Sequence, residues 1–323
     1  MNPRRALWPL VALLPLVLSL AALPASPSKL LPRIAFPEVA TIGRLTFVAR
    51  APWPTMPPTA TVYRVQPLKS PKAVALQVFA VLPMESTPEV RAELDRITRA
   101  PDPPLGEHEP LDEYVGDWQV SVFPEGQFSV YNRPACEAQD KGQASLPSEA
   151  VARRVADDFL ERLKPFIPYP VEFSGISPAA SVNGRALSHG VWYRAKLDGI
   201  PVGGDPVSVV IGPGAKVISA GSRVRRTIAD RKAPILTSKE AFEKLLAGEG
   251  CVESGPSWSA IAHVDSVHLA YYQPPLGLGA TYLLPVYVFS GQAVAEGRKP
   301  EAWGAAVEAV RPEFLQARTP VSR

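Results

Sequence analysis

The segment PVSVVIG (Pro206–Gly212), followed after a Gly-Pro-Gly turn by AKVISAGSRV (Ala215–Val224), decides the fold. Two apolar runs joined by such a turn are typical of a β-hairpin. The next segment, LTSKEAFEKLL (Leu236–Leu246), has a Thr-x-x-Glu capping box and predicts a helix. Two further apolar runs, VDSVHLAYY (Val264–Tyr272) and YLLPVYVFSG (Tyr282–Gly291), predict strands. The order is therefore hairpin, helix, strand, strand, which indicates a curved antiparallel sheet with one helix packed across it.

The preceding part of the chain shows the same order of elements. DWQVSVFPEGQFSVYN (Asp117–Asn132) predicts a hairpin, and LPSEAVARRVADDFLERL (Leu146–Leu163) has apolar residues at helical spacing. VEFSGISPAASV (Val171–Val182) and HGVWYRAKLDGIPV (His189–Val202) follow as strands. We therefore expect an α+β fold made of tandem repeats of a β-hairpin–α–β–β unit, preceded by an N-terminal hydrophobic helix.

The sequence also predicts the segments that precede and follow these two repeats. Ser70 and Pro71 begin a helix after the alternating strand ATVYRVQPL (Ala60–Leu68), and a charged, proline-rich loop with a short helix at Glu89–Thr98 follows. A helix near Glu301–Val310 is expected in a tail that frays. The predicted parts are an exported or anchoring segment at 1–25, a Pro-rich tether at 26–59, an N-terminal β-α unit at 60–116, repeat units at 117–202 and 203–292, and a tail at 293–323.

The N-terminus predicts the cellular location. Arg4 and Arg5 precede the apolar run ALWPLVALLPLVLSLAALPA (Ala6–Ala25), which is close to the length that spans a bilayer. The segment is either a cleaved signal peptide or a membrane anchor with the arginines on the cytoplasmic side. In both cases the remainder is expected outside the cytoplasm, tethered to the membrane through residues 6–25 or secreted.

The composition narrows the class of protein further. The 37 prolines, roughly twice the average usage, favour short elements joined by rigid loops. A net charge of +3, from 34 basic and 31 acidic residues, gives no electrostatic footprint for nucleic acid. Cys136 and Cys251 are candidates for a disulfide, because the predicted compartment permits one; two unpaired core cysteines are the alternative.

The sequence predicts no catalytic, cofactor-binding or metal-ligating residues. It contains no H-E-x-x-H, G-x-S-x-G, Walker or dinucleotide-binding pattern. His263 and His268 are expected on opposite faces of a strand, which does not suit a shared metal. The acidic cluster of Asp112, Glu113 and Asp117 is expected in a solvated loop, and a carboxylate pair for acid–base chemistry is the alternative. A basic group is interpreted as a solvated strand end, and contact with anionic lipid or cell-wall polymer is the alternative; its members are Arg223, Arg225, Arg226, Arg231 and Lys232.

Aromatic residues are the candidates for contact with a partner. They are Trp192, Tyr271, Tyr272 and Tyr287, which lie on predicted strands where side chains alternate between the core and an outer face. Tyr and Trp on the outer face are effective anchors for a protein partner. Core packing is the alternative for at least half of them.

The second predicted repeat resembles the C-terminal part of the YycH/YycI regulatory proteins of Gram-positive bacteria and, more loosely, PepSY-like repeats. The residues that carry the resemblance are G-I-P-V (Gly199–Val202), S-K-E-A-F (Ser238–Phe242), L-A-Y-Y (Leu269–Tyr272) and L-P-V-Y (Leu284–Tyr287), and the likeness extends from about Trp118 to Gly291. It implies one N-terminal membrane helix and an extracytoplasmic α+β domain that regulates a sensor histidine kinase through protein contacts, without chemistry of its own. The proline content and the long loop at Glu85–Glu113 depart from the family pattern.

We therefore expect a non-enzymatic, extracytoplasmic protein that binds a protein partner at the cell envelope, such as a sensor kinase, without a cofactor. The alternatives are a secreted PepSY-like module that inhibits a peptidase, and a hydrolase or a binder of cell-wall polymer that uses the acidic loop. We expect no reactive pocket between the two repeats, and no deep cleft in which polar side chains from both repeats converge.

Overall fold

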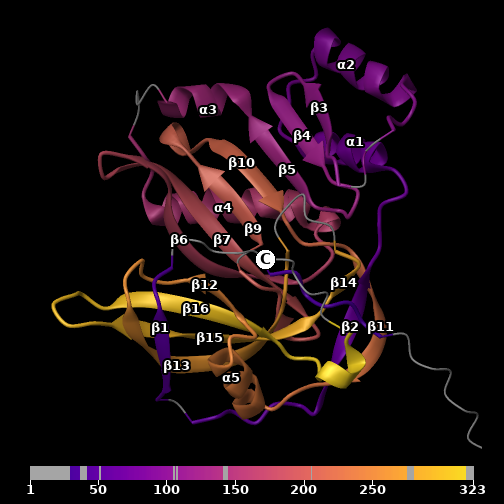
Figure 1. Ribbon diagram of the computed structural model, residues 1–323. Helices are drawn as coiled ribbons and strands as arrows, with labels where there is room; N and C mark the ends of the chain where they lie inside the picture. Colours follow the sequence, from indigo (N-terminus) through magenta and orange to yellow (C-terminus); the bar gives the residue numbers. More distant parts are fainter. Residues whose placement is uncertain are drawn as a thin grey trace, which may run out of the picture.

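The structure is a computed structural model, and it describes residues 30–36, 42–50, 52–104, 106, 108–140, 145–204, 206–274 and 280–317. Over these residues the chain is α+β, with mostly strands and five α-helices. The strands form three sheets, which are curved and not closed into a barrel (Figure 1). The predicted fold class is confirmed at this level.

The largest sheet is antiparallel and has eight strands in the order β3-β4-β5-β10-β9-β7-β6, with β8 paired to β7. Its strands are β3 (Leu111–Val115), β4 (Trp118–Val122), β5 (Phe128–Asn132), β10 (Val217–Ser222), β9 (Val207–Ile211), β7 (Arg185–Leu197), β6 (Val171–Val182) and β8 (Ile200–Pro201). The predicted hairpin within Asp117–Asn132 and the predicted strand Val171–Val182 are confirmed.

A second sheet has five strands in the order β1-β13-β15-β16-β12. They are β1 (Leu45–Ala49), which runs parallel to its neighbour, and the antiparallel strands β13 (Ala260–Tyr271), β15 (Pro285–Val294), β16 (Glu301–Glu308) and β12 (Cys251–Ser254). A third, small sheet contains β11 (Thr227–Pro234), β2 (Thr59–Val65) and β14 (Tyr282–Leu283). It lies beside the other two in Figure 1.

Helix starts follow the sequence signals closely. The helices are α1 (Pro71–Val81), α2 (Pro88–Arg99), α3 (Arg133–Asp140), α4 (Glu149–Leu163) and α5 (Ser238–Leu246). The side chains of Ser70 and Ser148 accept hydrogen bonds from backbone N–H groups at the starts of α1 and α4, and Thr237 and Glu240 form the complete capping box of α5. The caps predicted at Ser70 and Thr237 are confirmed, because a capped helix start depends only on neighbouring residues.

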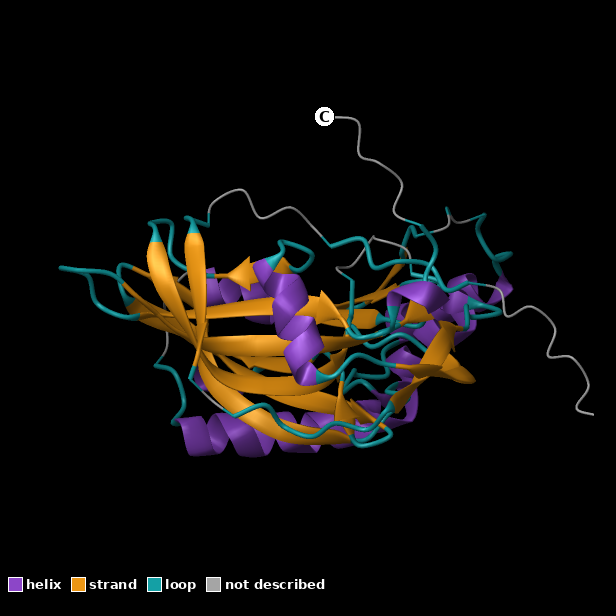
Figure 2. Ribbon diagram, turned by 60° about the horizontal axis from the view of Figure 1, so that its bottom comes forward, coloured by secondary structure: helices purple, strands orange, loops and turns teal. Residues whose placement is uncertain are grey.

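Helices α1 and α4 cover one face of the eight-stranded sheet, and α5 covers one face of the five-stranded sheet. On the opposite faces, α3 lies over strand ends of the large sheet and Ile34 and Phe36 pack on part of the five-stranded sheet; the rest of these faces is uncovered. The eight-stranded sheet packs its inward-facing valines, including Val120, Val130, Val191 and Val209, in one core with residues of α1 and α4. The five-stranded sheet packs Tyr287 and Phe289 in a core with α5. Figure 2 shows α4 and α5 lying across the strands that they cover. The uncovered parts of the two sheet faces can therefore contact each other or a ligand.

The predicted division into two separate repeats at residues 202/203 is wrong. The order hairpin, helix, strand, strand is present in both halves, but hairpin β9–β10 lies inside the first sheet, where Ala220 pairs with Val130 of β5 and Val209 pairs with Val191 of β7. The hairpin assigned to the second unit thus completes the sheet of the first. Pairing partners far apart in sequence decide this arrangement, and the local pattern does not encode them.

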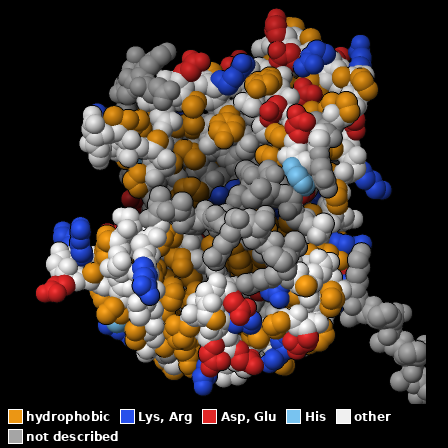
Figure 3. Space-filling model, in the orientation of Figure 1, with side chains coloured by type: hydrophobic (Ala, Val, Ile, Leu, Met, Phe, Trp, Pro, Cys, Tyr) orange, Lys and Arg blue, Asp and Glu red, His pale blue; other side chains and the backbone are white. Residues whose placement is uncertain are grey.

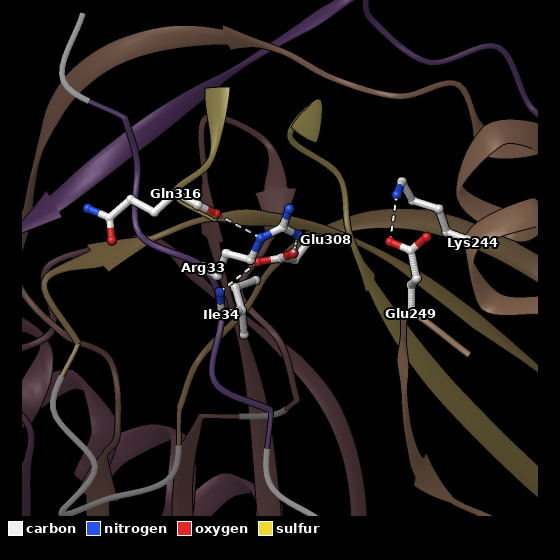
Figure 4. Close-up of polar contacts among 6 residues, drawn as sticks. All are labelled: Arg33, Ile34, Lys244, Glu249, Glu308 and Gln316. Atoms are coloured by element: carbon white, nitrogen blue, oxygen red, sulfur yellow. Dashed lines mark hydrogen bonds and ion pairs between the residues drawn. The ribbon is translucent and has the colours of Figure 1, made fainter. Parts of the chain in front are cut away.

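The predicted tether is also wrong for its described residues, because they pack on the domain. Leu31 is buried and pairs with Leu315, while β1 pairs with β13. Figure 4 shows how Glu308 of β16 holds this strap, residues 30–36: its carboxylate accepts hydrogen bonds from the Arg33 guanidinium and the Ile34 N–H, each at 2.7 Å. Nearby, Lys244 of α5 pairs with Glu249 at 2.7 Å.

Two further elements differ from the sequence predictions. The helix expected near Glu301–Val310 is strand β16, which lies between β15 and β12 with Trp303, Ala305 and Val307 buried at alternate positions. Sheet pairing overrides the helix propensity of its alanines and glutamates there. The basic group is not a solvated strand end, because Arg231 and Lys232 lie within strand β11 and Arg225 is fully buried.

The hydrophobic segment at 6–25 lies outside the described residues. Among the helices of the part that is described, none has the length and apolar character needed to cross a membrane.

Candidate functional site

A cleft of about 860 Å³ lies between the uncovered faces of the two large sheets. The eight-stranded sheet and its loops contribute Glu172, Arg194, Lys196 and Arg223, and the five-stranded sheet contributes Glu253, His268, Ala270, Val286 and Val288. Figure 3 shows this side of the molecule hollowed between its upper and lower halves, with hydrophobic side chains inside the hollow. The expectation of no cleft lined by polar side chains from both halves is therefore wrong.

Alternation along β7 aims its charged side chains into the cleft. Val191, Tyr193 and Ala195 are buried in the core with α4, so Arg194 and Lys196 point to the opposite face. The Lys196 ammonium donates to Glu172 of the neighbouring strand β6 at 2.9 Å. The upper wall of the cleft is therefore basic, with one carboxylate.

The lower wall carries one acid and one histidine. Both residues reach solvent at the cleft mouth, but the walls remove enough water to change their pKa values. Desolvation raises the pKa of the Glu253 carboxyl on β12. Desolvation and, secondarily, the charge of Arg194 lower the pKa of His268 on β13. Arg194 therefore acts electrostatically on His268, although the two belong to different sheets.

The back of the cleft is where the two large sheets join. Val202 forms a β-bridge with Tyr271, and the Gly203 N–H donates to the Tyr271 carbonyl at 2.7 Å. A β-carbon at Gly203 would lie 3.1 Å from that carbonyl oxygen, so glycine permits the close approach. The Gln273 side chain, just beyond this junction, lines the cleft; its amide nitrogen and oxygen are buried and have no hydrogen-bond partner among the described residues.

A tyrosine pair supports the junction from the core side. The Tyr63 hydroxyl donates to the Asp198 carboxylate, and the Tyr271 hydroxyl donates to the Thr61 carbonyl at 2.9 Å. Burial, with the bond to Asp198, raises the pKa of Tyr63 to about 12. Both phenols therefore stay neutral at physiological pH and act as fixed hydrogen-bond donors.

A buried ion pair fixes the loops beside the cleft. The Arg225 guanidinium, fully buried, donates to the Glu125 carboxylate in the turn of hairpin β4–β5 and to the Pro274 carbonyl at 2.9 Å. Glu125 also accepts from the Ala280 N–H at 3.3 Å. Burial lowers the pKa of Arg225, and the Glu125 charge opposes that shift. The ion pair thus connects a turn of the large sheet to the ends of β13 and β14.

The structure does not place the predicted partner-contact aromatics together on the surface. Tyr271 and Tyr287 are fully buried and Tyr272 is 8% exposed, and burial raises the pKa of Tyr272 and of Tyr287 to about 12. Tyr287 donates to the Leu236 carbonyl at 2.5 Å, which ties β15 to the start of α5. These three tyrosines are core residues, and only Trp192 is partly exposed.

The predicted disulfide is not formed. Cys136 lies in α3 beside the eight-stranded sheet, whereas Cys251 lies in β12 at an edge of the five-stranded sheet. Burial raises the pKa of the Cys251 thiol, which favours its neutral form.

The remaining predicted groups do not form a shared site. No three His, Cys, Asp or Glu side chains of the described residues converge as metal ligands would. The acidic cluster lies on and beside strand β3 instead of in a loop, and its Glu113 pairs with Arg96 at 3.6 Å.

Sequence reasoning missed the charged side chains of the cleft. Arg194 and Lys196 alternate with buried residues of β7, and Glu172 of β6 pairs with Arg194; the alternation along β7 is visible in the sequence. It marks an uncovered sheet face, but it does not show that a second sheet faces it.

Comparison with known proteins adds no function. No protein-family model matches the sequence, and no curated protein matches it. The chain is similar to the crystal structure of an uncharacterized protein from Eubacterium rectale ATCC 33656, with a TM-score of 0.40 and 9% identity over 85% of this chain and 91% of that chain. A likeness this distant carries no argument about fold or function.

Proposed function

We propose that this protein is a non-catalytic binding protein that acts outside the cytoplasm and modulates a protein of the cell envelope, such as a sensor kinase. One observation carries the proposal: the cleft between the uncovered sheet faces, with charged side chains on both walls. Such a concave surface, built on rigid strands, suits the binding of a protruding segment of a partner.

Two features of the cleft support a binding role. Its polar groups are spread along both walls, from Lys196 and Arg194 to Glu253, as in a surface that recognises an extended partner. On its lower wall the half-buried Val288 offers apolar area for burial by a partner. The predicted N-terminal export segment supports the location, and the resemblance to YycH/YycI proteins supports the kind of partner.

The proposal is tested by site-specific photocrosslinking of the full-length protein in the cells that produce it. A photoreactive amino acid at Lys196 or Val288 is expected to capture one and the same envelope protein. The matched control is Arg154, which is exposed on α4 at the covered face of the large sheet. Arg194→Glu, which reverses a charge of the cleft wall, should remove the crosslink from both cleft positions.

The result can overturn the proposal in two ways. Capture of the same proteins from Arg154 as from the cleft positions would show contact without a site. No captured protein at any cleft position would exclude a partner that binds there.

We also propose that the fold is built from a repeated unit. The same order of hairpin, helix and two strands around α4 and around α5 supports an origin of the two halves from one repeated unit. In this view the second hairpin is shared between the halves and aligns their uncovered faces across the cleft.

A further inference from the structure

The uncovered face of the eight-stranded sheet continues beyond the cleft, and we call this part of the face, from Tyr114 on β3 to Trp192 on β7, the trough. Helix α3 covers the upper ends of the strands, where Gln139 donates to the buried Ser188 at 3.1 Å. The five-stranded sheet lies on the other side, as Figure 1 shows. The trough between them crosses the strands of the sheet, and its floor is the face opposite the α4 core.

Trp192 forms a fixed aromatic platform on this floor. A β-carbon at Gly190 would lie 2.8 Å from Cζ2 and 2.9 Å from Cε2 of the indole, so the ring lies over Gly190. The indole Nε1–H donates to Ser177 Oγ of the neighbouring strand at 2.8 Å. One ring face is therefore held against the sheet, and the other is available at the partly exposed surface. A ring fixed in this way loses little entropy when a ligand stacks on it.

Two exposed tyrosines continue the line of the platform across the sheet. The strand register connects Tyr114 of β3 to Tyr131 of β5 through Gln119 of β4. From Tyr131 it continues through Ser219 of β10 and Val210 of β9 to Gly190 of β7, which lies under the indole. Tyr131 is 43% and Tyr114 46% exposed. At about 4.8 Å between strands, the aromatic positions are roughly 10 and 14 Å apart. That spacing suits a chain with flat units lying across the strands.

A second row of register partners crosses the same face, two positions along the strands from this line, and most of its residues are small or carry a hydroxyl. From β4 to β6 it contains Ser121, Ser129, Gly221, Ser208, Trp192 and Gly175. Glycine and serine leave space above the strands, and the hydroxyls donate and accept hydrogen bonds. Polyol rings fit such a floor, because their C–H faces stack on aromatic rings and their hydroxyls pair with serines.

The next row makes the trough basic. It contains Arg194 with Glu172 opposite, and Arg223 and Lys196 line the cleft beside it. At the other end, the Arg133 guanidinium lies 5.8 Å from the centre of the Tyr114 ring. Four cations thus accompany two carboxylates along this face, Glu172 and Asp112, which pairs in register with Ser121, and the net positive charge complements an anionic ligand.

We infer that this trough binds an acidic polysaccharide, with sugar rings on Trp192 and Tyr131 and carboxylates toward Arg194 and Lys196. A peptide is a poorer occupant, because backbone groups in the middle of a sheet are already paired and strand addition requires a free edge. The inference does not depend on the proposed protein partner, because a soluble polysaccharide would bind the trough of the purified protein without that partner.

The test measures binding of the purified protein to polygalacturonate and hyaluronan by isothermal titration calorimetry and affinity electrophoresis. Neutral dextran controls for charge, and poly-glutamate controls for a peptide of the same charge. The variants are Trp192→Ala, Tyr131→Ala and the double variant Arg194→Gln with Lys196→Gln. Leu246→Ala, an exposed apolar residue on α5, and Arg154→Gln on α4 are the matched controls.

At least one carboxylated polysaccharide is expected to bind at least tenfold more tightly than dextran. Trp192→Ala and the double variant should each weaken that binding at least tenfold, with unchanged circular dichroism, and the two controls should leave it unchanged. Ser177→Ala, which frees the indole but keeps the ring, should weaken binding less than Trp192→Ala does. The inference is overturned if neither acidic polysaccharide binds, if dextran binds equally, if Trp192→Ala binds like the wild type, or if poly-glutamate binds with the same dependence on Trp192.

Discussion

Arg225→Met is expected to be among the most damaging single substitutions in this protein. The Arg225 side chain is fully buried, and the Glu125 side chain with which it pairs is 10% exposed. Methionine keeps much of the volume but leaves a buried carboxylate without its counter-charge. Removing one partner of a buried ion pair costs about 3–5 kcal/mol. For a domain of this size, a loss of that order lowers Tm by about 10 °C.

The double variant distinguishes two contributions to the free energy of unfolding: the destabilisation by an unpaired buried carboxylate, and the net stabilisation by the ion pair. Glu125→Gln with Arg225→Met removes both charges, and replacement of a buried pair by neutral groups is often close to neutral. We therefore expect the double variant to be more stable than Arg225→Met alone, with a coupling free energy of about 2 kcal/mol or more. The exposed pair of Arg99 and Asp95, 3.2 Å apart, is the control, and its removal should change stability within experimental error.

The assay is urea unfolding at pH 7, followed by far-ultraviolet circular dichroism and by tryptophan fluorescence. The ion pair connects the β4–β5 turn to the ends of β13 and β14, so both signals should shift together in Arg225→Met. A loss below about 1 kcal/mol in Arg225→Met, or strict additivity in the double variant, would refute the reasoning.

Three further predictions concern other parts of the structure. Glu308→Ala should lower the free energy of unfolding by about 3 kcal/mol, because the Arg33 guanidinium and the Ile34 N–H each lose a charged acceptor; an unchanged urea midpoint would show that the strap is not held there. Thr237→Ala should cost about 1 kcal/mol through loss of the α5 cap, measured in the same way, and Thr237→Ser should restore most of it. Glu253→Gln should raise Tm at pH 7, because the folded-state pKa of this carboxyl is raised and ionisation therefore disfavours the folded state. The gain should disappear as the pH falls below the unfolded pKa of about 4.5, where the wild-type carboxyl is protonated in both states, and a gain independent of pH would contradict this assignment.

Local features of the sequence predicted local structure well. The caps at Ser70 and Thr237 and the strand Val171–Val182 are predicted from neighbouring residues alone, and each is confirmed. The alanine-rich segment that becomes β16 shows the opposite case, because its place between two strands overrides its helix propensity.

The site itself was beyond the sequence for a physical reason. Tyr271 and Trp192 are both aromatic residues on strands, yet Tyr271 is buried at the junction of the sheets and Trp192 lies on an uncovered face. A period of two shows that neighbouring side chains point to opposite faces, but it does not show which face a helix covers. The position of Gly190, which gives space to the indole, becomes meaningful only when the rotamer is known.

Hairpin β9–β10 determines how the two sheets share one binding face. It supplies two strands in the middle of the eight-stranded sheet, between β5 and β7, and the short segment after it carries Arg225 to the buried pair with Glu125. The segment before it passes through Gly203, whose N–H joins the edge of the five-stranded sheet at Tyr271. Because both ends of the hairpin are fixed to the junction, the cleft and the trough above it form on one continuous sheet face. A ligand that lies across the trough therefore reaches the cleft wall at Arg194 without a change in the fold.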